Sequence, residues 1–473
     1  MMTSTTVSDA APARRSAGKL AVGSWMLFDW ASQPYYTLIT TFLFAPFFAS
    51  YFIGDAARGS ALWGYAMAAA AITVAVGSPI LGAMADARGR LKPYMAWLSV
   101  AFVLSQAALW YAVPGSGSGT VALVVFALII STCAGEFTTV LNNSLMPRLV
   151  PADQLGRLSG AGWALGYLGG LISLIIMVAF ILIDAQTGRT MLGLDPVYAF
   201  DVPSHEADRF VGPFCALWYA VFVIPYFLFT PDVPDKPNAA RVSVRAAFAS
   251  MMTTLRNIAG YRDIALFFIA RMLFIDGLLA IFTFGGVYAA AVFGWQTIVI
   301  GYFGIILSVA AGVGALVGGF LDDRLGSKPV IIWSLLLLIV GALGVISIDR
   351  THVLLTLEVV PPVAGGGVFA STGERVYILF AILIGLASGP LQSASRSLLA
   401  RMAPEEHMSE FFGFFAFSGK VTAFAAPFVV ALVSDMTGSL QIAMASILVF
   451  LLAGLAVMGM IRTGGDHAFL AQK

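Results

Sequence analysis

Six ionisable side chains fall inside long apolar segments of this sequence, where charged groups are rare. They are three acids and three bases: Asp29, Glu136, Asp276, Arg271, Arg396 and Lys420. An ionisable side chain near the centre of a bilayer costs about 2.5 to 3.5 kcal/mol on insertion scales, so each one needs a compensating role. Acids and bases in equal number could neutralise one another as ion pairs, or could line a water-filled cleft.

The three acids are candidates for proton binding. A carboxylate that is partly withdrawn from water can take up and release a proton as its exposure changes. We expect Glu136 and Asp276 to lead in this role, with Asp29, nearer a helix end, as a third candidate. The alternative is a purely structural role, and Arg271 could form an ion pair with Asp276 five positions along the same helix.

The three bases are candidates for binding an anionic group of a solute. A fixed cation in a low-dielectric cleft attracts a carboxylate or phosphate strongly, so Arg271, Arg396 and Lys420 are assigned to a substrate cleft. Polar and aromatic residues of the same segments are candidates for its lining, although packing is the commoner role of each: Trp30, Tyr35, Tyr36, Asn142, Asn143, Trp163, Tyr167 and Gln392.

Nothing in the sequence supports enzyme chemistry or a bound metal. The four histidines are dispersed, and no CxxC, Walker or HExxH pattern occurs. Cys133 and Cys215 both lie in apolar segments, where a thiol behaves as a small buried hydrophobe, so no disulfide is expected. We therefore expect no enzymatic activity, no metal site and no cofactor.

The composition requires a lipid environment. Of the 473 residues, 59% are apolar and 11% are charged, whereas roughly a quarter of a soluble chain is charged. Such a chain cannot coat a surface that faces water. Its net charge of +1 gives no reason to expect a nucleic-acid partner.

Apolar runs long enough to cross a bilayer recur along the chain, since about 20 helical residues cover a core of roughly 30 Å. Twelve are predicted, at residues 25–50, 60–83, 93–113, 120–144, 158–183, 210–230, 263–292, 297–320, 329–348, 375–399, 410–434 and 439–461. Lipid offers no partner for backbone N–H and C=O groups, and the runs are too long and unalternating for barrel strands. The spans must therefore be helices, and Gly162, Gly166 and Gly170 at GxxxG spacing predict close helix packing.

The basic residues predict the orientation. Most of the 26 Lys and Arg residues fall in the terminal tails and in the connections on the same side of the membrane. The positive-inside rule places that side, with both termini, in the cytoplasm. We expect an integral protein of a bacterial inner membrane.

The longest connection on this side covers residues 231–262. Apolar residues recur in it at helical spacing with basic residues opposite, which predicts an amphipathic helix at the membrane surface. A linker role is expected in preference to a regulatory one. The expected domains are a tail (1–24), a six-helix bundle (25–230), this linker (231–262), a second six-helix bundle (263–461) and a tail (462–473).

Two halves of the sequence repeat one another. GAMADARGRLKP (82–93) realigns with GGFLDDRLGSKP (318–329) at an offset of 236 positions, and NSLMPRLVP (143–151) with RSLLARMAP (396–404) at an offset of 253. Charged residues and prolines matched in order indicate a duplicated six-helix unit in parallel orientation. The predicted fold is an all-α polytopic membrane protein, with twelve transmembrane helices in two bundles related by pseudo-two-fold symmetry and a cleft between them.

The loop after the second span resembles the signature of the major facilitator superfamily, Gly-x-x-x-Asp-Arg-x-Gly-Arg-Arg. The matching residues are Gly82, Asp86, Arg88, Gly89, Arg90 and Lys92, with an alanine where the first arginine is usual. The resemblance implies that this loop and its repeat latch the two halves in the outward-facing state. The expected cytoplasmic gate is Asp86, Arg88, Arg90, Asp322 and Arg324. The alternative is that these are ordinary positive-inside residues.

Motifs along nearly the whole chain are similar to the vacuolar amino-acid-effluxer-like branch of that superfamily. They are FDWASQPYYTLITTFLFAPFFASYF, RLSGAGWALGYLGG, ARMLFIDGLLAIFTFGGVYAA and SRSLLARMAPEEHMSEFFGFFAFSGK. The resemblance implies a secondary transporter that works by alternating access, coupled to protons, with efflux of an amino acid or related metabolite. Two alternatives stay open, a uniporter of the same fold and a receptor or scaffold that binds without translocating. The expected partners are a small solute, a proton and the lipid bilayer, and the expected state is a monomer, because one chain contains both halves of the cleft.

Overall fold

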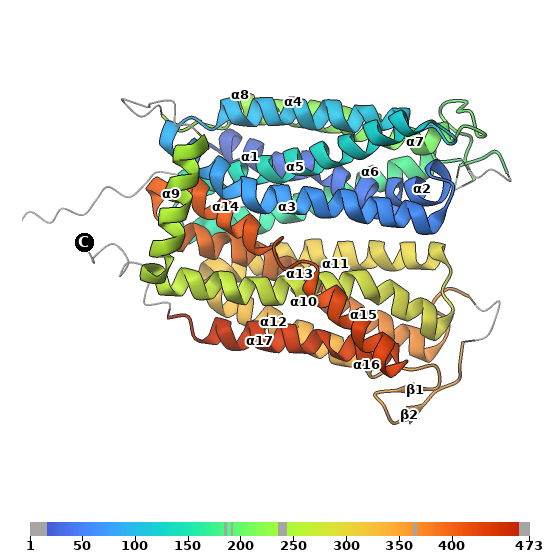
Figure 1. The fold of residues 1–473 in the computed structure, drawn as a ribbon. Helices are drawn as coiled ribbons and strands as arrows, with labels where there is room; N and C mark the ends of the chain where they lie inside the picture. Colours follow the sequence, from blue (N-terminus) through green and yellow to red (C-terminus); the bar gives the residue numbers. More distant parts are fainter. Residues whose placement is uncertain (1–16, 184–186, 191–192, 235–243, 363–366, 463–473) are drawn as a thin grey trace, which may run out of the picture.

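The computed structural model describes residues 17–183, 187–190, 193–234, 244–362 and 367–462, which are predominantly helical (Figure 1). Parts of the predicted tails (1–24 and 462–473) and of the predicted linker (231–262) lie outside these residues.

The first half of the chain forms one bundle of helices. Its elements are α1 (Lys19–Pro34), η1 (Tyr35–Phe42), α2 (Phe44–Phe47), η2 (Phe48–Phe52), α3 (Ala56–Arg88), α4 (Lys92–Ala108), η3 (Leu109–Tyr111), α5 (Ser118–Leu149), η4 (Ala152–Gln154), α6 (Leu155–Phe180), α7 (Glu206–Phe222) and α8 (Ile224–Phe229). Local chemistry sets the helix ends. The Asp55 carboxylate accepts the backbone N–H of Arg58 at 2.9 Å where α3 begins, and Gly89, with φ of 95°, follows its last residue.

The second half forms the other bundle, and α9 (Val244–Asn257) and η5 (Ile258–Tyr261) lie between the two. Its elements are α10 (Arg262–Phe293), α11 (Thr297–Leu325), α12 (Ser327–Ile346), α13 (Thr372–Met402), η6 (Glu405–His407), α14 (Met408–Ser418), α15 (Ala425–Thr437), α16 (Leu440–Ala445) and α17 (Ile447–Gly459). A reciprocal capping box between Ser371 and Glu374 begins α13. The short antiparallel strands β1 (His352–Val353) and β2 (Leu357–Glu358) form a hairpin in the loop before it.

Two of the twelve spans are interrupted. Ten helices of the described chain are long and apolar enough to cross a membrane. The first span, α1 to η2, passes from α-helix to π-helix directly after Pro34. The eleventh span consists of α14 and α15, which are separated by a turn at residues 419–424. Together with the ten these give the predicted twelve spans, and such breaks often occur where a transporter binds its solute.

The two bundles lie side by side with their helices roughly parallel (Figure 1). α9 lies at one end, where the described chain also starts and finishes, and β1 and β2 lie at the other. We call these the α9 end and the hairpin end. Across the interface α3 packs against α14, and α6 packs against α11 and α13.

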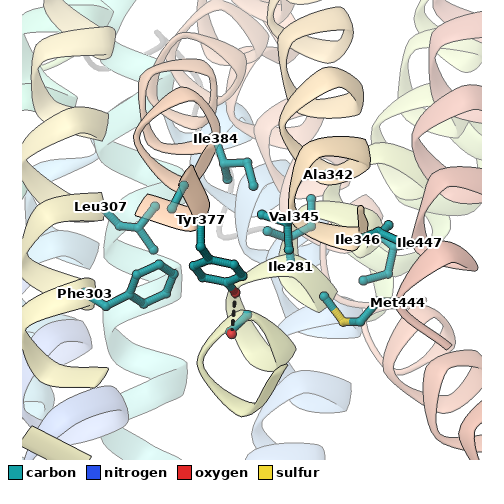
Figure 2. A pocket seen from close by; sticks show the side chains of 12 residues that line it. Ile281, Phe303, Leu307, Ala342, Val345, Ile346, Tyr377, Ile384, Met444 and Ile447 are labelled. Carbon is teal, nitrogen blue, oxygen red and sulfur yellow. Dashed lines mark hydrogen bonds between the residues drawn. The ribbon is translucent and has the colours of Figure 1, made fainter. Parts of the chain in front are cut away.

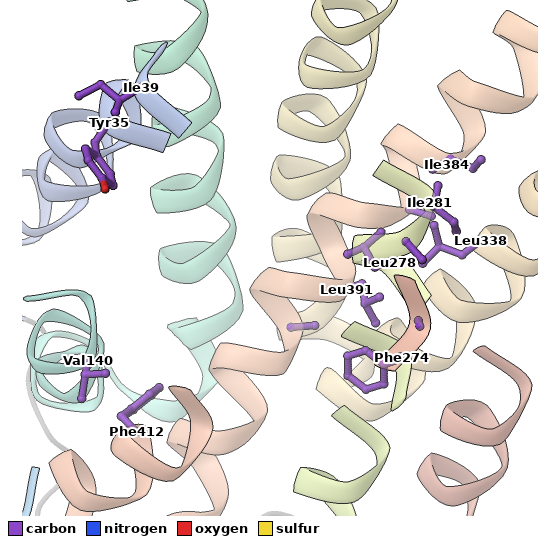
Figure 3. Close-up of a cluster of buried hydrophobic side chains, with 14 of the residues drawn as sticks. Tyr35, Ile39, Val140, Phe274, Leu278, Ile281, Leu338, Ile384, Leu391 and Phe412 are labelled. Carbon is purple, nitrogen blue, oxygen red and sulfur yellow. The ribbon is translucent and has the colours of Figure 1, made fainter. Parts of the chain in front are cut away.

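Buried apolar side chains fill both bundles and reach the interface between them (Figure 3). Phe274, Leu278 and Ile281 project from α10 into the second bundle, while Phe412 of α14 lies close to Val140 of α5 (Figure 3). Most buried apolar side chains of the described residues thus belong to one continuous core that runs through both bundles.

Candidate functional site

One ion pair joins the two bundles through the break in the eleventh span. Lys420 lies in the turn between α14 and α15, and its Nζ is 2.8 Å from Oε1 of Glu136, in the middle of α5. The two side chains are 32% and 16% exposed. Both charges are therefore paired and still accessible from outside the packed core, as a solute-binding group must be.

Arg271 of α10 stabilises the same break from the side of the second bundle. Its Nη1 donates hydrogen bonds to the carbonyl oxygen of Phe415, at 2.6 Å, and to the hydroxyl of Ser418, at 2.8 Å. The guanidinium carbon also lies 3.5 Å from the centroid of the Phe415 ring. A cation at the last turn of α14 compensates carbonyl groups that the interrupted helix leaves unpaired. The Arg271 Nε remains buried without a partner.

Asp276 lies on α10 beside the same turn, and its side chain is 1% exposed. Its Oδ1 and the hydroxyl of Thr422 are buried without a partner at hydrogen-bond geometry, and the two groups lie close enough for Thr422 to stabilise the carboxylate. Among the described residues no ion pair links Asp276 to Arg271, so the direct pairing considered from their spacing does not form. Buried polar groups are nearly always paired, so this cluster has unused capacity to bind a proton or a polar ligand.

Arg396 of α13 forms a second connection between the bundles, nearer the α9 end. Its Nη1 is 3.1 Å from both Asp29 Oδ2 and Asn143 Oδ1, and its Nε and Nη2 donate to the hydroxyl and carbonyl of Ser159. The guanidinium also lies over the Trp25 and Trp163 rings, at 5.1 and 5.9 Å. Every partner belongs to the first bundle, so Arg396 is a buried cation that holds the two bundles together rather than a free solute-binding group.

Gly162 makes room for this cluster. A Cβ at this position would lie 2.6 Å from Asp29 Oδ2 and 3.0 Å from Arg396 Nη2. The glycine predicted to bring helices together therefore also admits an ion pair between them.

The predicted lining residues divide into two groups. Tyr167 and Gln392 meet across the bundles, with 3.2 Å between the Tyr167 hydroxyl and the Gln392 Nε2. Trp163 and Asn143 belong to the Arg396 cluster.

The others pack within the first bundle. The Tyr35 hydroxyl lies 2.7 Å from that of Thr132, and the Tyr36 ring packs edge-on against Tyr35 at 5.3 Å. Trp30 stacks on Trp218 at 5.5 Å. Asn142 is fully buried, and its side-chain amide has no partner.

Two contacts, which we call latches, close the α9 end. In the first latch Asp86 of α3 accepts the backbone N–H groups of Ser409 and Glu410, at 3.1 and 2.8 Å, in the first turn of α14. A carboxylate placed there satisfies free donors and complements the helix dipole. A Cβ on Gly82, one turn before Asp86, would overlap the Ser409 carbonyl oxygen, so the glycine is required for this approach.

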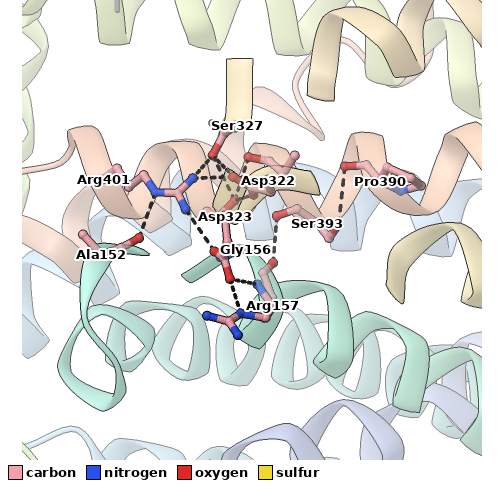
Figure 4. Close-up of polar contacts among 12 residues, drawn as sticks. Ala152, Gly156, Arg157, Asp322, Asp323, Ser327, Pro390, Ser393 and Arg401 are labelled. Atoms are coloured by element: carbon pink, nitrogen blue, oxygen red, sulfur yellow. Dashed lines mark hydrogen bonds and ion pairs between the residues drawn. The ribbon is translucent and has the colours of Figure 1, made fainter. Parts of the chain in front are cut away.

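The second latch repeats this contact at the same end of the molecule, between α11 of the second bundle and α6 of the first (Figure 4). Asp323 of α11 accepts the backbone N–H groups of Gly156 and Arg157, at 2.7 and 3.1 Å, in the first turn of α6. The Arg157 side chain adds an ion pair of 2.7 Å with Asp323. A Cβ on Gly319 would lie 2.7 Å from the Gly156 carbonyl oxygen.

Only some of the predicted gate residues connect the two bundles. Asp86 forms the first latch, but Asp322 hydrogen-bonds within its own bundle, to Ser327, Ser397 and Arg401.

Two of the predicted arginines, Arg88 and Arg324, make no contact across the bundles among those that the structure describes. Arg324 is exposed, the Arg88 guanidinium lies 5.8 Å from the Tyr94 ring centroid, and Arg90 lies between α3 and α4. The aspartate of α11 that reaches across is Asp323, one position beyond the one predicted from the sequence repeat. The structural repeat from Asp86 to Asp323, and from Gly82 to Gly319, has an offset of 237.

His407 borders the first latch outside the spans. Its Nδ1 lies 3.2 Å from Oε2 of Glu410, and the two side chains are 49% and 1% exposed. The hydrogen bond with Glu410 raises the pKa of His407, the charges of Glu410, Asp86 and Glu406 add to this effect, and partial burial opposes it. This imidazole therefore carries its positive charge to a higher pH than an ordinary histidine.

An apolar pocket inside the second bundle is not a candidate for the solute (Figure 2). Apart from the Tyr377 hydroxyl, which donates to the Gly285 carbonyl at 2.7 Å, its lining is aliphatic and aromatic. Its volume of about 20 Å³ has room for about one water molecule.

This geometry matches a known class of membrane protein. The crystal structure of FucP, a transporter of the major facilitator superfamily in the outward conformation, superposes with a TM-score of 0.67 over 94% of this chain and 99% of that chain, at 13% identity. The protein has the twelve-helix major facilitator fold, as predicted.

Sequence comparison gives the branch. The family model described as vacuole effluxer Atg22 like matches residues 50–464, and the chain belongs to this family. The uncharacterized MFS-type transporter YxiO of Bacillus subtilis is 25% identical over 446 residues, which cover 93% of this chain and 94% of that protein. Autophagy-related protein 22 of Cryptococcus neoformans is 27% identical over 310 residues, 64% of this chain and 50% of the relative. The chain is thus an integral membrane transporter of the major facilitator type, and the predicted resemblance is confirmed.

Proposed function

We propose that the protein exports a zwitterionic solute of the amino-acid class by alternating access, and that movement of the solute is coupled to a proton. The observation that supports this most directly is the ion pair between Glu136 and Lys420, which joins the bundles at the break of the eleventh span.

An amino acid carries both charges that this pair requires. Its ammonium group can replace Lys420 as the partner of Glu136, and its carboxylate can replace Glu136 as the partner of Lys420. Neither protein charge is then left unpaired, which would be costly in a low-dielectric site. Because the pair spans the interface, exchanging it for a bound solute also loosens one connection between the bundles.

Asp276 is the leading candidate for the coupling proton. Burying an ionised carboxylate that lacks a partner is expensive, and the neutral acid is the cheaper form. In the described conformation we assign a proton to Asp276. Opening of the α9 end would admit water to this region and release the proton, while Glu136 exchanges partners nearby.

The two latches and the Arg396 cluster hold the α9 end closed in this conformation. A solute therefore reaches Glu136 and Lys420 from the hairpin end, and the alternative conformation must break contacts at the α9 end. The excess of Lys and Arg at the α9 end supports a cytoplasmic location for it. The description of the family as vacuole effluxers supports export as the direction of transport.

The test compares solutes that differ in one charge. Purified protein is titrated with an amino acid, with its decarboxylated amine and with its N-acetylated acid, and thermal stability is measured at acid and neutral pH. A ligand that binds the folded state raises the apparent melting temperature by mass action. We expect the intact zwitterion alone to stabilise the protein, and Glu136→Gln to weaken its binding about 30-fold, corresponding to about 2 kcal/mol.

Coupling is tested with Asp276→Asn in proteoliposomes. The substitution should abolish solute accumulation driven by a pH gradient while downhill exchange continues. Downhill transport that never responds to a pH gradient, even in the unaltered protein, would establish the uniporter instead. Binding without any flux would establish the non-translocating receptor, and stabilisation by the amine or the acid alone would contradict the zwitterion.

A further inference from the structure

The two latches use equivalent backbone positions but opposite charges. Ser409 and Glu410 in the first latch correspond to Gly156 and Arg157 in the second, at the repeat offset of 253 positions. Arg157 pairs with Asp323 at 2.7 Å, so the second latch combines a carboxylate with a permanent cation. At the matching position the first latch carries Glu410, another acid.

The first latch therefore places two acidic residues, Asp86 and Glu410, around one imidazole, that of His407. Asp86 accepts the backbone N–H of Glu410 at 2.8 Å, and the Glu410 side chain is 1% exposed, with its Oε1 buried and unpartnered. Like charges in such surroundings oppose each other unless a proton or a cation intervenes. The group placed to supply the positive charge is His407, whose Nδ1 lies 3.2 Å from Glu410 Oε2.

We propose that Asp86, Glu410 and His407 form a proton-binding site at the α9 end, and that a proton on His407 favours the closed state of this end. Protonated His407 supplies the positive charge of the first latch, as Arg157 supplies a permanent positive charge in the second. Half of its side chain is exposed, so protons from water reach it while the α9 end is closed. The site is separate from Asp276 and from the solute, so it does not depend on the function proposed above.

The charges around His407 determine whether closure of the α9 end strengthens or weakens as the pH rises. Three acidic groups act on His407: Glu410 of α14, Asp86 of α3 and Glu406 of η6. They raise the pKa of His407 in the closed state. The stabilisation is therefore fully present below the ordinary histidine pKa, near 6.5, and is lost as the pH rises through the raised value. Closure should weaken at alkaline pH on the side of the α9 end.

Ser144 offers a reporter for this closure. Its side chain is buried in α5, and its hydroxyl lies 3.1 Å from that of Ser409 across the first latch. The full chain would carry Ser144→Cys, with Cys133→Ser and Cys215→Ala to remove the native thiols. Its alkylation by a hydrophilic maleimide is measured in detergent without solute, from about pH 5.5 to about pH 8.5, on either side of the histidine value. Dividing each rate by that of the unfolded chain at the same pH removes the titration of the thiol itself.

We expect the normalised rate to rise on the order of threefold with pH, the ratio that a partly exposed ion pair provides. In His407→Gln the rise should be much smaller than in the protein with His407, because Asp86 of the same site still titrates, and the rate at acid pH should approach the alkaline rate of that protein. In Glu410→Arg, which copies the second latch, it should stay low throughout. The matched control is His205→Gln, which removes a histidine paired with Asp208 in another part of the molecule and should keep the threefold rise.

The proposal would be overturned if the alkylation rate of the Ser144→Cys reporter protein did not change with pH. It would also be overturned if His407→Gln in that protein kept the full threefold rise. The melting temperature of each variant shows whether it is folded, and Glu410→Gln supplies a second test if Glu410→Arg is not. Because one carboxylate is then neutral, Glu410→Gln should also flatten the pH dependence. An unaltered threefold rise in that variant would likewise contradict the proposed site.

Discussion

At the α9 end the first latch joins α3 to α14 and the second joins α11 to α6, and each uses an aspartate to receive the first turn of a helix in the opposite bundle. The backbone contacts are nearly interchangeable. The side chains are not, because Arg157 completes the second latch and Glu410 with His407 completes the first. The duplicated six-helix units thus keep equivalent backbone contacts between the bundles. The side chains at these contacts differ, and they determine the pH and salt concentration at which each latch stays closed.

Arg396 lies between the bundles, close to the pseudo-two-fold axis that relates them. It hydrogen-bonds Asn143, which is its own repeat equivalent 253 positions earlier. A residue can touch its symmetry mate only near the pseudo-two-fold axis. The Arg396 cluster therefore belongs to neither latch, and it should support both equally.

The largest effect is expected from Arg396→Met. The substitution leaves Asp29, whose side chain is 14% exposed, without its cation, and breaking a buried pair costs about 3–5 kcal/mol. The melting temperature in detergent should fall markedly, and the double variant Asp29→Asn/Arg396→Met should recover part of the loss. Equal stability of the single and double variants would show that the ion pair does not hold the bundles together.

A smaller effect is expected from adding a methyl group at the glycine of either latch, where α3 meets α14 or α11 meets α6. Gly82→Ala would place Cβ against the Ser409 carbonyl in the first latch, and Gly319→Ala would place it 2.7 Å from the Gly156 carbonyl in the second. Overpacking of this kind costs about 1–3 kcal/mol. Each variant should raise alkylation of Ser144→Cys by opening the α9 end, with Gly82→Ala the stronger because its overlap is closer.

Gly64→Ala is the control for this pair. Gly64 also lies on α3, but a Cβ there meets nothing within 4 Å. Its alkylation rate should equal that of the parent. Similar rates in all three glycine variants would mean that the crossings are not tight in solution.

The sequence predicts the fold well because the bilayer dictates it. Runs of about 20 apolar residues predict the spans, and the helices extend beyond the predicted runs, as in α3, which continues through Arg88. The interruption of the eleventh span was not predicted, since Gly419–Phe424 is as apolar as its surroundings apart from Lys420 and Thr422. Hydropathy measures transfer into lipid and carries little information about helix continuity.

The latch was predicted in part, and the reason is geometric. The sequence GGFLDD offers two glycines and two adjacent aspartates, so an offset of 236 and an offset of 237 both match Gly and Asp. Successive helical residues point about 100° apart, since a turn takes 3.6 residues. Asp322 therefore faces Ser397 in its own bundle, while Asp323 faces α6, and Arg401 pairs with both aspartates. The pairing of Glu136 with Lys420 depends on how the bundles dock, which no local pattern encodes.

The smallest effect, and the sharpest comparison with the first latch, is expected from Arg157→Gln. The Arg157 side chain is 50% exposed, so its ion pair with Asp323 contributes only about 0.5 kcal/mol and weakens as salt is added. Asp323 also keeps its two backbone donors and its ion pair with Arg401, at 3.4 Å. Alkylation of Ser144→Cys should therefore rise only about twofold at low ionic strength, and the pH dependence conferred by His407 should persist. Arg157→His, by contrast, should add a second titrating latch and steepen that dependence. If Arg157→His leaves the pH dependence of alkylation unchanged, the charge at this position does not control closure of the α9 end. The two latches would then respond alike to pH although their side chains differ.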